Sequence, residues 1–101
     1  MSKKKVLVTG SSRGIGNSIL EFFLNDEFIP IGTATSSNGI EMIKKKFSDN
    51  NISGHALELD LNNTNSIENF FKNMKQEGLS PDILVNNACL LYTSDAADDW
   101  S

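Results

Sequence analysis

The chain has 101 residues, 39% of them hydrophobic, which fits one globular domain at most. Its net charge of −4 argues against a general binder of nucleic acid or of membrane surfaces. One cysteine, one histidine and the lack of any long apolar run exclude an intrachain disulfide, a cysteine-rich metal site and a transmembrane helix. The apolar stretch after Lys5 is too short for a signal peptide, so we expect a cytoplasmic protein.

The first apolar run, residues 5–9, predicts a short β-strand that leads directly into glycines at positions 10, 14 and 16. Apolar side chains then recur at helical spacing, which predicts a helix from about Gly14 to Asn25. Glycines between a strand and a helix let the backbone and the helix N-terminus approach a pyrophosphate closely. The start of the chain therefore predicts a dinucleotide-binding unit.

A second strand and a second helix are predicted over residues 28–49. Residues 28–33 are strand-like, but Pro30 cannot donate to a hydrogen-bond ladder, so we expect regular pairing to begin just after it. Asn38 and Glu41 form a capping pattern at the start of the following helix. Its apolar side chains recur at helical spacing until polar residues interrupt them.

The rest of the chain repeats this strand–helix pattern. Residues 56–61 alternate as a third strand, and Thr64 or Asn65 caps a third helix that ends near Gly78. Residues 82–86 form a fourth strand. The order β-α-β-α-β-α-β predicts an α/β fold with a parallel sheet of spatial order 3-2-1-4, the N-terminal half of a Rossmann-type doubly wound sheet. Nucleotide is expected where the strand order switches, between strands 1 and 4.

Three motifs follow the ends of these strands. The glycine spacing is G-x-x-x-G-x-G, and no Gly-Lys-Ser/Thr of a P-loop follows it. Thr-Gly-Ser-Ser-Arg-Gly-Ile-Gly at 9–16, Asp60-Leu61, and Asn86-Asn87-Ala88 together resemble the short-chain dehydrogenase/reductase family. Cys89 departs from that pattern, because the family usually has glycine there. A glycine-rich turn without a ligand is the alternative for the first motif.

The residues themselves favour NADPH over NADH. Enzymes that use NAD commonly place an acidic residue at the end of the second strand, where it holds the ribose 2′-hydroxyl. Here no acid occurs between Gly32 and Glu41. Thr35 and neighbouring hydroxyls can bind a 2′-phosphate, and Arg13 can supply positive charge.

The resemblance implies a cofactor site in which the glycine loop lies along the phosphates and the later motifs lie near adenosine. The implied cofactor-binding residues are Gly10, Ser11, Ser12, Arg13, Gly14, Ile15, Gly16, Thr35, Asp60, Leu61 and Asn87. Asp60 and Leu61 would flank the adenine; the alternative is that Asp60 simply ends a strand and starts a turn. No metal site is implied.

Residues 31–36, 38–39 and 66–68 are similar to a narrower group, the bacterial 3-oxoacyl-[acyl-carrier-protein] reductases. That group reduces a β-ketoacyl thioester with NADPH in fatty-acid biosynthesis, often as a homotetramer. The alternatives are a short-chain dehydrogenase for another carbonyl or alcohol substrate and a non-catalytic NADP-sensing module. The family's catalytic serine, tyrosine and lysine would all follow the fourth strand. The only tyrosine, Tyr92, is followed four residues later by Ala96, so we expect no catalytic residue in this chain.

The last thirteen residues do not continue the family pattern. Codons for Cys-Leu-Leu-Tyr-Thr-Ser and Asp-Ala-Ala-Asp can be chosen that resemble the end of a transposase-type sequencing adapter read through in frame. We therefore expect residues 1–88 to be a partial NADP-binding domain and residues 89–101 to be a non-native tail. A genuine but divergent tail is the competing interpretation.

Overall fold

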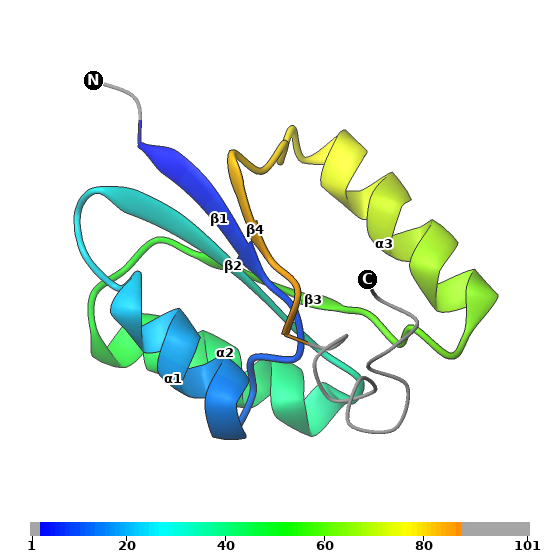
Figure 1. Cartoon of the computed structure of the whole chain (residues 1–101), viewed down its shortest axis with the longest axis horizontal. Helices are drawn as coiled ribbons and strands as arrows, with labels where there is room; N and C mark the ends of the chain where they lie inside the picture. The colour runs from blue at the N-terminus through cyan, green and yellow to red at the C-terminus, as the bar shows by residue number, and fades with distance from the viewer. Residues whose placement is uncertain (1–2, 88–101) are drawn as a thin grey trace, which may run out of the picture.

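The computed structural model describes residues 3–87, which form a four-stranded parallel sheet with three helices (Figure 1). The strand order is β3-β2-β1-β4, which confirms the predicted fold class and order. Residues 89–101, predicted to be a non-native tail, lie outside the described residues. The elements are β1 (Lys4–Val8), α1 (Gly14–Phe22), β2 (Phe28–Ala34), α2 (Ser37–Asp49), β3 (His55–Glu58), α3 (Thr64–Gln76) and β4 (Ile83–Val85).

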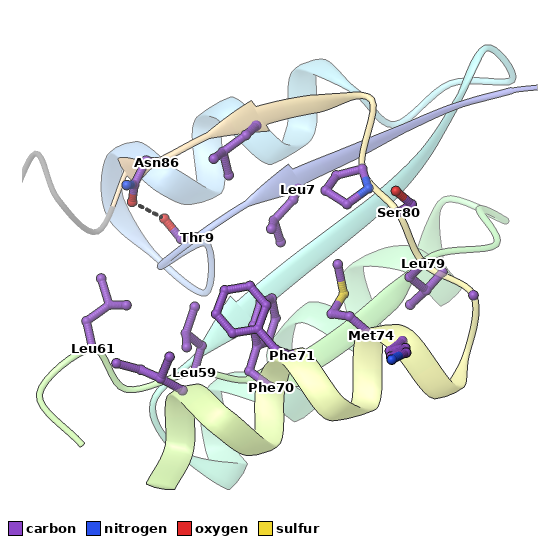
Figure 2. A pocket seen from close by; sticks show the side chains of 15 residues that line it. Leu7, Thr9, Leu59, Leu61, Phe70, Phe71, Met74, Leu79, Ser80 and Asn86 are labelled. Carbon is purple, nitrogen blue, oxygen red and sulfur yellow. Dashed lines mark hydrogen bonds between the residues drawn. The ribbon is translucent and has the colours of Figure 1, made fainter. Parts of the chain in front are cut away.

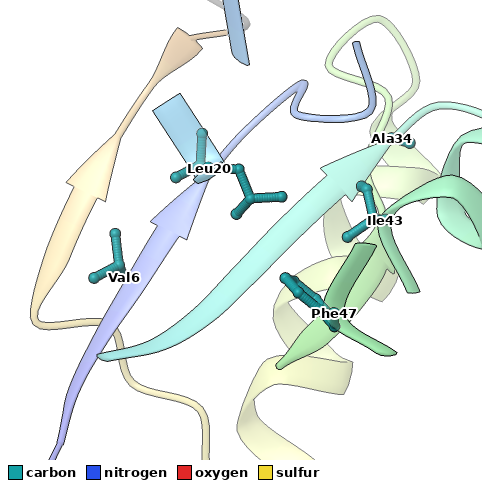
Figure 3. Close-up of a cluster of buried hydrophobic side chains, with 6 residues drawn as sticks. Val6, Leu20, Ala34, Ile43 and Phe47 are labelled. Atoms are coloured by element: carbon teal, nitrogen blue, oxygen red, sulfur yellow. The ribbon is translucent and has the colours of Figure 1, made fainter. Parts of the chain in front are cut away.

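The sheet lies between two helical layers, with α1 and α2 on one face and α3 on the other (Figure 1). Side chains alternate along β1, so Val6 and Val8 face α1 and α2 whereas Leu7 faces α3. The cluster buried on the first face (Figure 3) consists of Val6, Val8, Leu20, Ala34, Ile43 and Phe47. The cluster on the second face consists of Leu7, Ile31, Leu59, Phe70, Met74 and Leu79.

Regular pairing of β2 includes Pro30, so the expectation that it begins after the proline was wrong. The register with β1 places Pro30 opposite Val6. Alternate residues of a strand direct their backbone groups to the same side. Ala34 accepts a hydrogen bond from Leu59 N–H on the β3 side, so Pro30 faces that side as well. Pairing with β3 begins only at Ile31, so the missing N–H of the proline removes no ladder hydrogen bond.

The caps of α2 and α3 lie before their predicted positions. Ser36 caps α2 rather than Asn38, and Asn63 caps α3 rather than Thr64 or Asn65. Both capping residues have extended backbones, and each side chain accepts a hydrogen bond from the N–H three residues later. Runs of polar residues offer several capping candidates, and the last extended residue among them takes the role.

Several elements are shorter than predicted. α1 ends at Phe22 rather than at Asn25, and β3 ends at Glu58 rather than at residue 61. β4 covers only Ile83–Val85. β3 stops early because the chain turns at Asp60, whose Oδ1 accepts a hydrogen bond from Asn62 N–H at 3.0 Å.

Candidate functional site

A hollow of about 610 Å³ lies where the strand order switches, at the carboxyl end of the sheet. The glycine turn after β1, the end of β2 and the first turns of α2 form most of its wall. Asn87, which follows β4, completes it. Its lining residues are Gly10, Ser12, Arg13, Gly14, Ile15, Ala34, Thr35, Ser36, Asn38, Gly39, Met42 and Asn87. Ligands of open α/β sheets bind at this position of the fold.

The N-terminus of α1 is the part of the hollow best suited to an anion. The first N–H groups of a helix have no partner within the helix. In α2 and α3 a side chain caps one of these groups, but Arg13 at the N-cap of α1 makes no side-chain cap. The first turn of α1 also contains no acidic residue. Uncapped amides and the positive end of the helix dipole together favour a phosphate here.

The three glycines of the turn have different structural roles. Gly10 and Gly14 have φ values of +59° and +65°, a region that glycine adopts without steric cost. Gly16 instead provides space, because a Cβ there would overlap the Gly10 carbonyl oxygen and would lie 2.5 Å from Asn87 Nδ2. The glycine spacing therefore allows both the shape of the turn and its contact with α1.

Hydrogen bonds tie the turn to the neighbouring strands. Gly10 N–H donates to Thr33 Oγ1 at 3.0 Å, and Asn87 Nδ2 donates to the Gly10 carbonyl at 3.0 Å. Thr9 Oγ1 donates to Asn86 Oδ1 at 3.1 Å, which joins the ends of β1 and β4 (Figure 2). Asn87 is 2% exposed, and its Oδ1 is buried with no partner. A buried acceptor without a partner, beside a hollow, suits a ligand that donates to it.

The charge of the hollow is positive. Among the described residues that line it, Arg13 is the only charged one, and it is exposed at the mouth together with Thr35 and Ser36. No carboxylate lines the end of β2. This arrangement fits a phosphate-bearing group better than a free ribose hydroxyl, which a carboxylate commonly holds.

Seven of the eleven predicted residues line this hollow: Gly10, Ser12, Arg13, Gly14, Ile15, Thr35 and Asn87. Gly16 lies in α1 behind the turn. The side chain of Ser11 is fully buried, and its hydroxyl accepts from Thr33 N–H at 3.2 Å rather than facing the hollow.

Asp60 and Leu61 are not brought to the hollow. Asp60 is half-buried in a turn, where its N–H donates to Ser66 Oγ at 2.9 Å. Leu61 lines a different cavity, on the α3 face. These contacts match the interpretation of Asp60 as a residue that ends a strand and starts a turn.

Sequence reasoning missed the contribution of α2 to the hollow, from Asn38, Gly39 and Met42. The first turn of α2 packs directly on the strand end, because a Cβ at Gly39 would lie 2.6 Å from Ala34 Cβ and 3.2 Å from Ser12. A glycine inside a helix is unfavourable unless something approaches it closely. Gly39 was therefore the sequence feature that could have indicated the close contact between α2 and the end of β2.

A second cavity, of about 600 Å³, lies between α3 and the β1–β4 side of the sheet (Figure 2). We call it the α3 groove. Its wall is mainly apolar and includes Leu7, Leu61, Phe70, Met74 and Leu79. Two apolar residues of its wall are strongly exposed, namely Phe71 (65%) and Leu84 (59%).

Among residues 3–87, no helix is long and apolar enough to cross a membrane. Across the same range, no group of three or more His, Cys, Asp and Glu side chains is placed to hold a metal ion.

The family model of the short chain dehydrogenases matches residues 4–100. The chain therefore belongs to this family, as its glycine turn and Asn86-Asn87-Ala88 motif indicated.

Several curated proteins with one shared name are similar to this chain over most of its length. The chain is 42% identical over 88 residues to a 3-oxoacyl-[acyl-carrier-protein] reductase FabG of Haemophilus influenzae, with 87% of this chain and 35% of the relative covered. It is 44% identical over 85 residues to the protein of that name from Salmonella typhimurium (84% and 34%) and 42% identical to that from Escherichia coli (84% and 34%). The chain thus spans about a third of the length of these relatives.

Proposed function

We propose that this chain carries the NADPH-binding half of a reductase that acts on 3-oxoacyl groups attached to acyl-carrier protein. The observation that carries the proposal is the uncapped N-terminus of α1, which borders a hollow lined, among residues 3–87, by one charged residue, Arg13. The relatives named above are reductases of that substrate, which supports the choice of substrate class.

The residues present fit the cofactor. The amides of residues 12–16 suit the pyrophosphate, and the unpartnered Asn87 Oδ1 suits a ribose hydroxyl that donates to it. Arg13 and Thr35 suit the 2′-phosphate. Asp60 and Leu61 follow the end of β3 and lie outside the hollow, and we propose that they approach the adenine end of a nucleotide that extends beyond it.

In the proposed reaction, bound NADPH supplies a hydride to the keto carbon of the acyl thioester. The residues of this chain bind and orient the nucleotide. A tyrosine with a lysine four residues later would donate the proton to the developing alkoxide, and no Tyr-x-x-x-Lys occurs in residues 1–101. We place that pair in the longer parent protein, which we propose to be a cytoplasmic homotetramer.

The α3 groove supports the proposal that residues 1–88 are the first part of a longer domain. A parallel strand added beyond β4 would be reached by a right-handed crossover, as β4 is reached from β3. That crossover places its helix on the α3 face of the sheet (Figure 1). The helix would then cover Phe71 and Leu84, the exposed apolar residues of the groove.

Titration of the chain with NADPH and with NADH tests the cofactor assignment. We expect tighter binding of NADPH, and we expect Arg13→Gln to weaken NADPH binding about tenfold while leaving NADH binding unchanged. Lys72→Gln, which removes an exposed positive charge on α3, is the matched control and should change neither affinity. Equal affinity of the unaltered chain for the two nucleotides would refute the role of Arg13. A parent reading frame without Tyr-x-x-x-Lys would favour the NADP-sensing module over the enzyme.

A further inference from the structure

Gly32 lies in the interior of β2, where a glycine weakens a strand unless something approaches it closely. It is paired on both sides, opposite Val8 in β1 and Ala56 in β3. Its backbone does not require glycine, because the positive-φ glycines of the described residues are at positions 10, 14 and 78. A Cβ at Gly32 would lie 2.6 Å from Ser11 Oγ. Gly32 is therefore small because the Ser11 hydroxyl, the nearest atom, and the Ile43 side chain at 3.0 Å occupy the space beside it.

Ser11 uses that space to bond with the next residue of the strand. Thr33 N–H donates to Ser11 Oγ at 3.2 Å, and Ser11 N–H donates to the Thr33 carbonyl at 2.9 Å. A third bond runs from Gly10 N–H to Thr33 Oγ1 at 3.0 Å. Ser11 is 0% and Thr33 is 1% exposed, so water does not replace the two bonds between them when one is lost, whereas the bond from Gly10 is part-buried. We call these three bonds the Ser11–Thr33 clamp.

The clamp connects two opposite walls of the hollow of about 610 Å³, where we propose that the nucleotide binds. On one side it holds the turn that leads to the uncapped amides of α1. On the other it holds β2 two residues before Thr35 and three before Ser36, which line the opposite wall. A shift of the turn relative to β2 would move the pyrophosphate donors away from the rest of the hollow.

We propose that Thr33, through the Ser11–Thr33 clamp, is a positioning residue for dinucleotide binding, and that Gly32 provides the space the clamp needs. The inference rests on the proposed NADPH site. Thr33 itself does not touch the nucleotide, because it is buried behind the turn and does not line the hollow.

Thr33→Val and Thr33→Ser test this role in the 101-residue chain. Valine keeps the shape of threonine but removes the acceptor for Gly10 N–H, whereas serine keeps it. We expect Thr33→Val to raise the dissociation constants of NADPH and of NADH alike by about tenfold, because the part-buried Gly10 N–H loses its acceptor and no longer holds the turn against β2. Thr33→Ser should stay close to the unaltered chain. A purely structural role would lower the fraction of chain that binds without changing the dissociation constant.

Amide hydrogen exchange examines the clamp without a nucleotide. The Gly10 amide should exchange slowly in the unaltered chain and in Thr33→Ser, and quickly in Thr33→Val. If Thr33→Val does not fold, Ser11→Ala takes its place, with an expected weakening of about tenfold as well, because the buried Thr33 N–H loses its acceptor. Unchanged dissociation constants in a folded variant, while the unaltered chain binds NADPH, would overturn the clamp alone. Failure of the unaltered chain to bind either nucleotide would overturn the proposed function and this inference together.

Discussion

The two faces of the sheet differ in how completely their apolar side chains are buried. On the face of α1 and α2, buried side chains such as Leu20 and Ile43 are fully enclosed, and the polar groups of the glycine turn are tied to β2 and to Asn87. On the face of α3, Phe71 and Leu84 remain exposed beside the α3 groove. The proposed nucleotide site lies mainly on the first face, because the segments around β1, α1, β2 and α2 supply all of the described lining residues of the hollow except Asn87. The comparison shows that the side chains around a proposed binding site can be fully packed while apolar side chains on the other face of the same sheet stay exposed.

The largest expected difference between the faces is in the free energy of unfolding. Ile43→Ala removes a fully buried side chain and should lower this free energy by about 4 kcal/mol. Phe71→Ala removes a larger side chain that is 65% exposed, and should lower it by less than about 1 kcal/mol. Urea denaturation followed by circular dichroism measures both. Equal losses would mean that the α3 groove is closed in solution, by another part of the chain or by a second copy.

A smaller effect distinguishes two glycines of the same turn. Gly16→Ala places a methyl group against the Gly10 carbonyl and Asn87, and should cost about 3 kcal/mol of stability and weaken nucleotide binding. Gly14→Ala meets nothing within 4 Å and incurs only the strain of its positive φ, about 1 kcal/mol. Thermal unfolding and NADPH titration of both variants provide the measurement. A cost for Gly14→Ala equal to that of Gly16→Ala would show that conformation, not space, governs the turn.

The architecture was predictable because it depends on patterns within short segments. Alternating strand and helix patterns, with a right-handed crossover at each step, leave few possible strand orders, and the 3-2-1-4 order was among them. Pro30 was misjudged because its effect depends on where β3 begins, which local sequence does not reveal. The caps at Ser36 and Asn63 were misjudged for a different reason, since each lies in a run of polar residues that are all acceptable caps.

The positions of the site residues were predictable only where the backbone conformation of the turn determines them. The glycine turn and Arg13 follow from the motif, and the structure places them in one hollow. The direction of the Ser11 side chain does not follow from the motif, because Thr33, 22 residues later in the chain, holds it. The packing of α2 at Gly39 is likewise a contact between segments distant in sequence. Side-chain direction in a turn is thus set by partners that a local pattern cannot identify.

The smallest expected effect on stability concerns the open edge of the sheet. Leu84 lies on β4, which has β1 on one side and no paired strand among the described residues on the other. An apolar residue on such an edge promotes association between copies. Leu84→Lys should therefore increase solubility and reduce self-association, while changing the free energy of unfolding by no more than about 0.5 kcal/mol. NADPH affinity should stay unchanged, because Leu84 does not line the nucleotide hollow.

Asn69→Lys is the matched control, because it adds the same charge to an exposed position of α3 outside the α3 groove. Analytical ultracentrifugation over a range of concentrations compares the two variants with the unaltered chain. If both lysines reduce association equally, net charge rather than the open edge controls it. If only Leu84→Lys does so, the open edge is the surface through which copies of the chain associate.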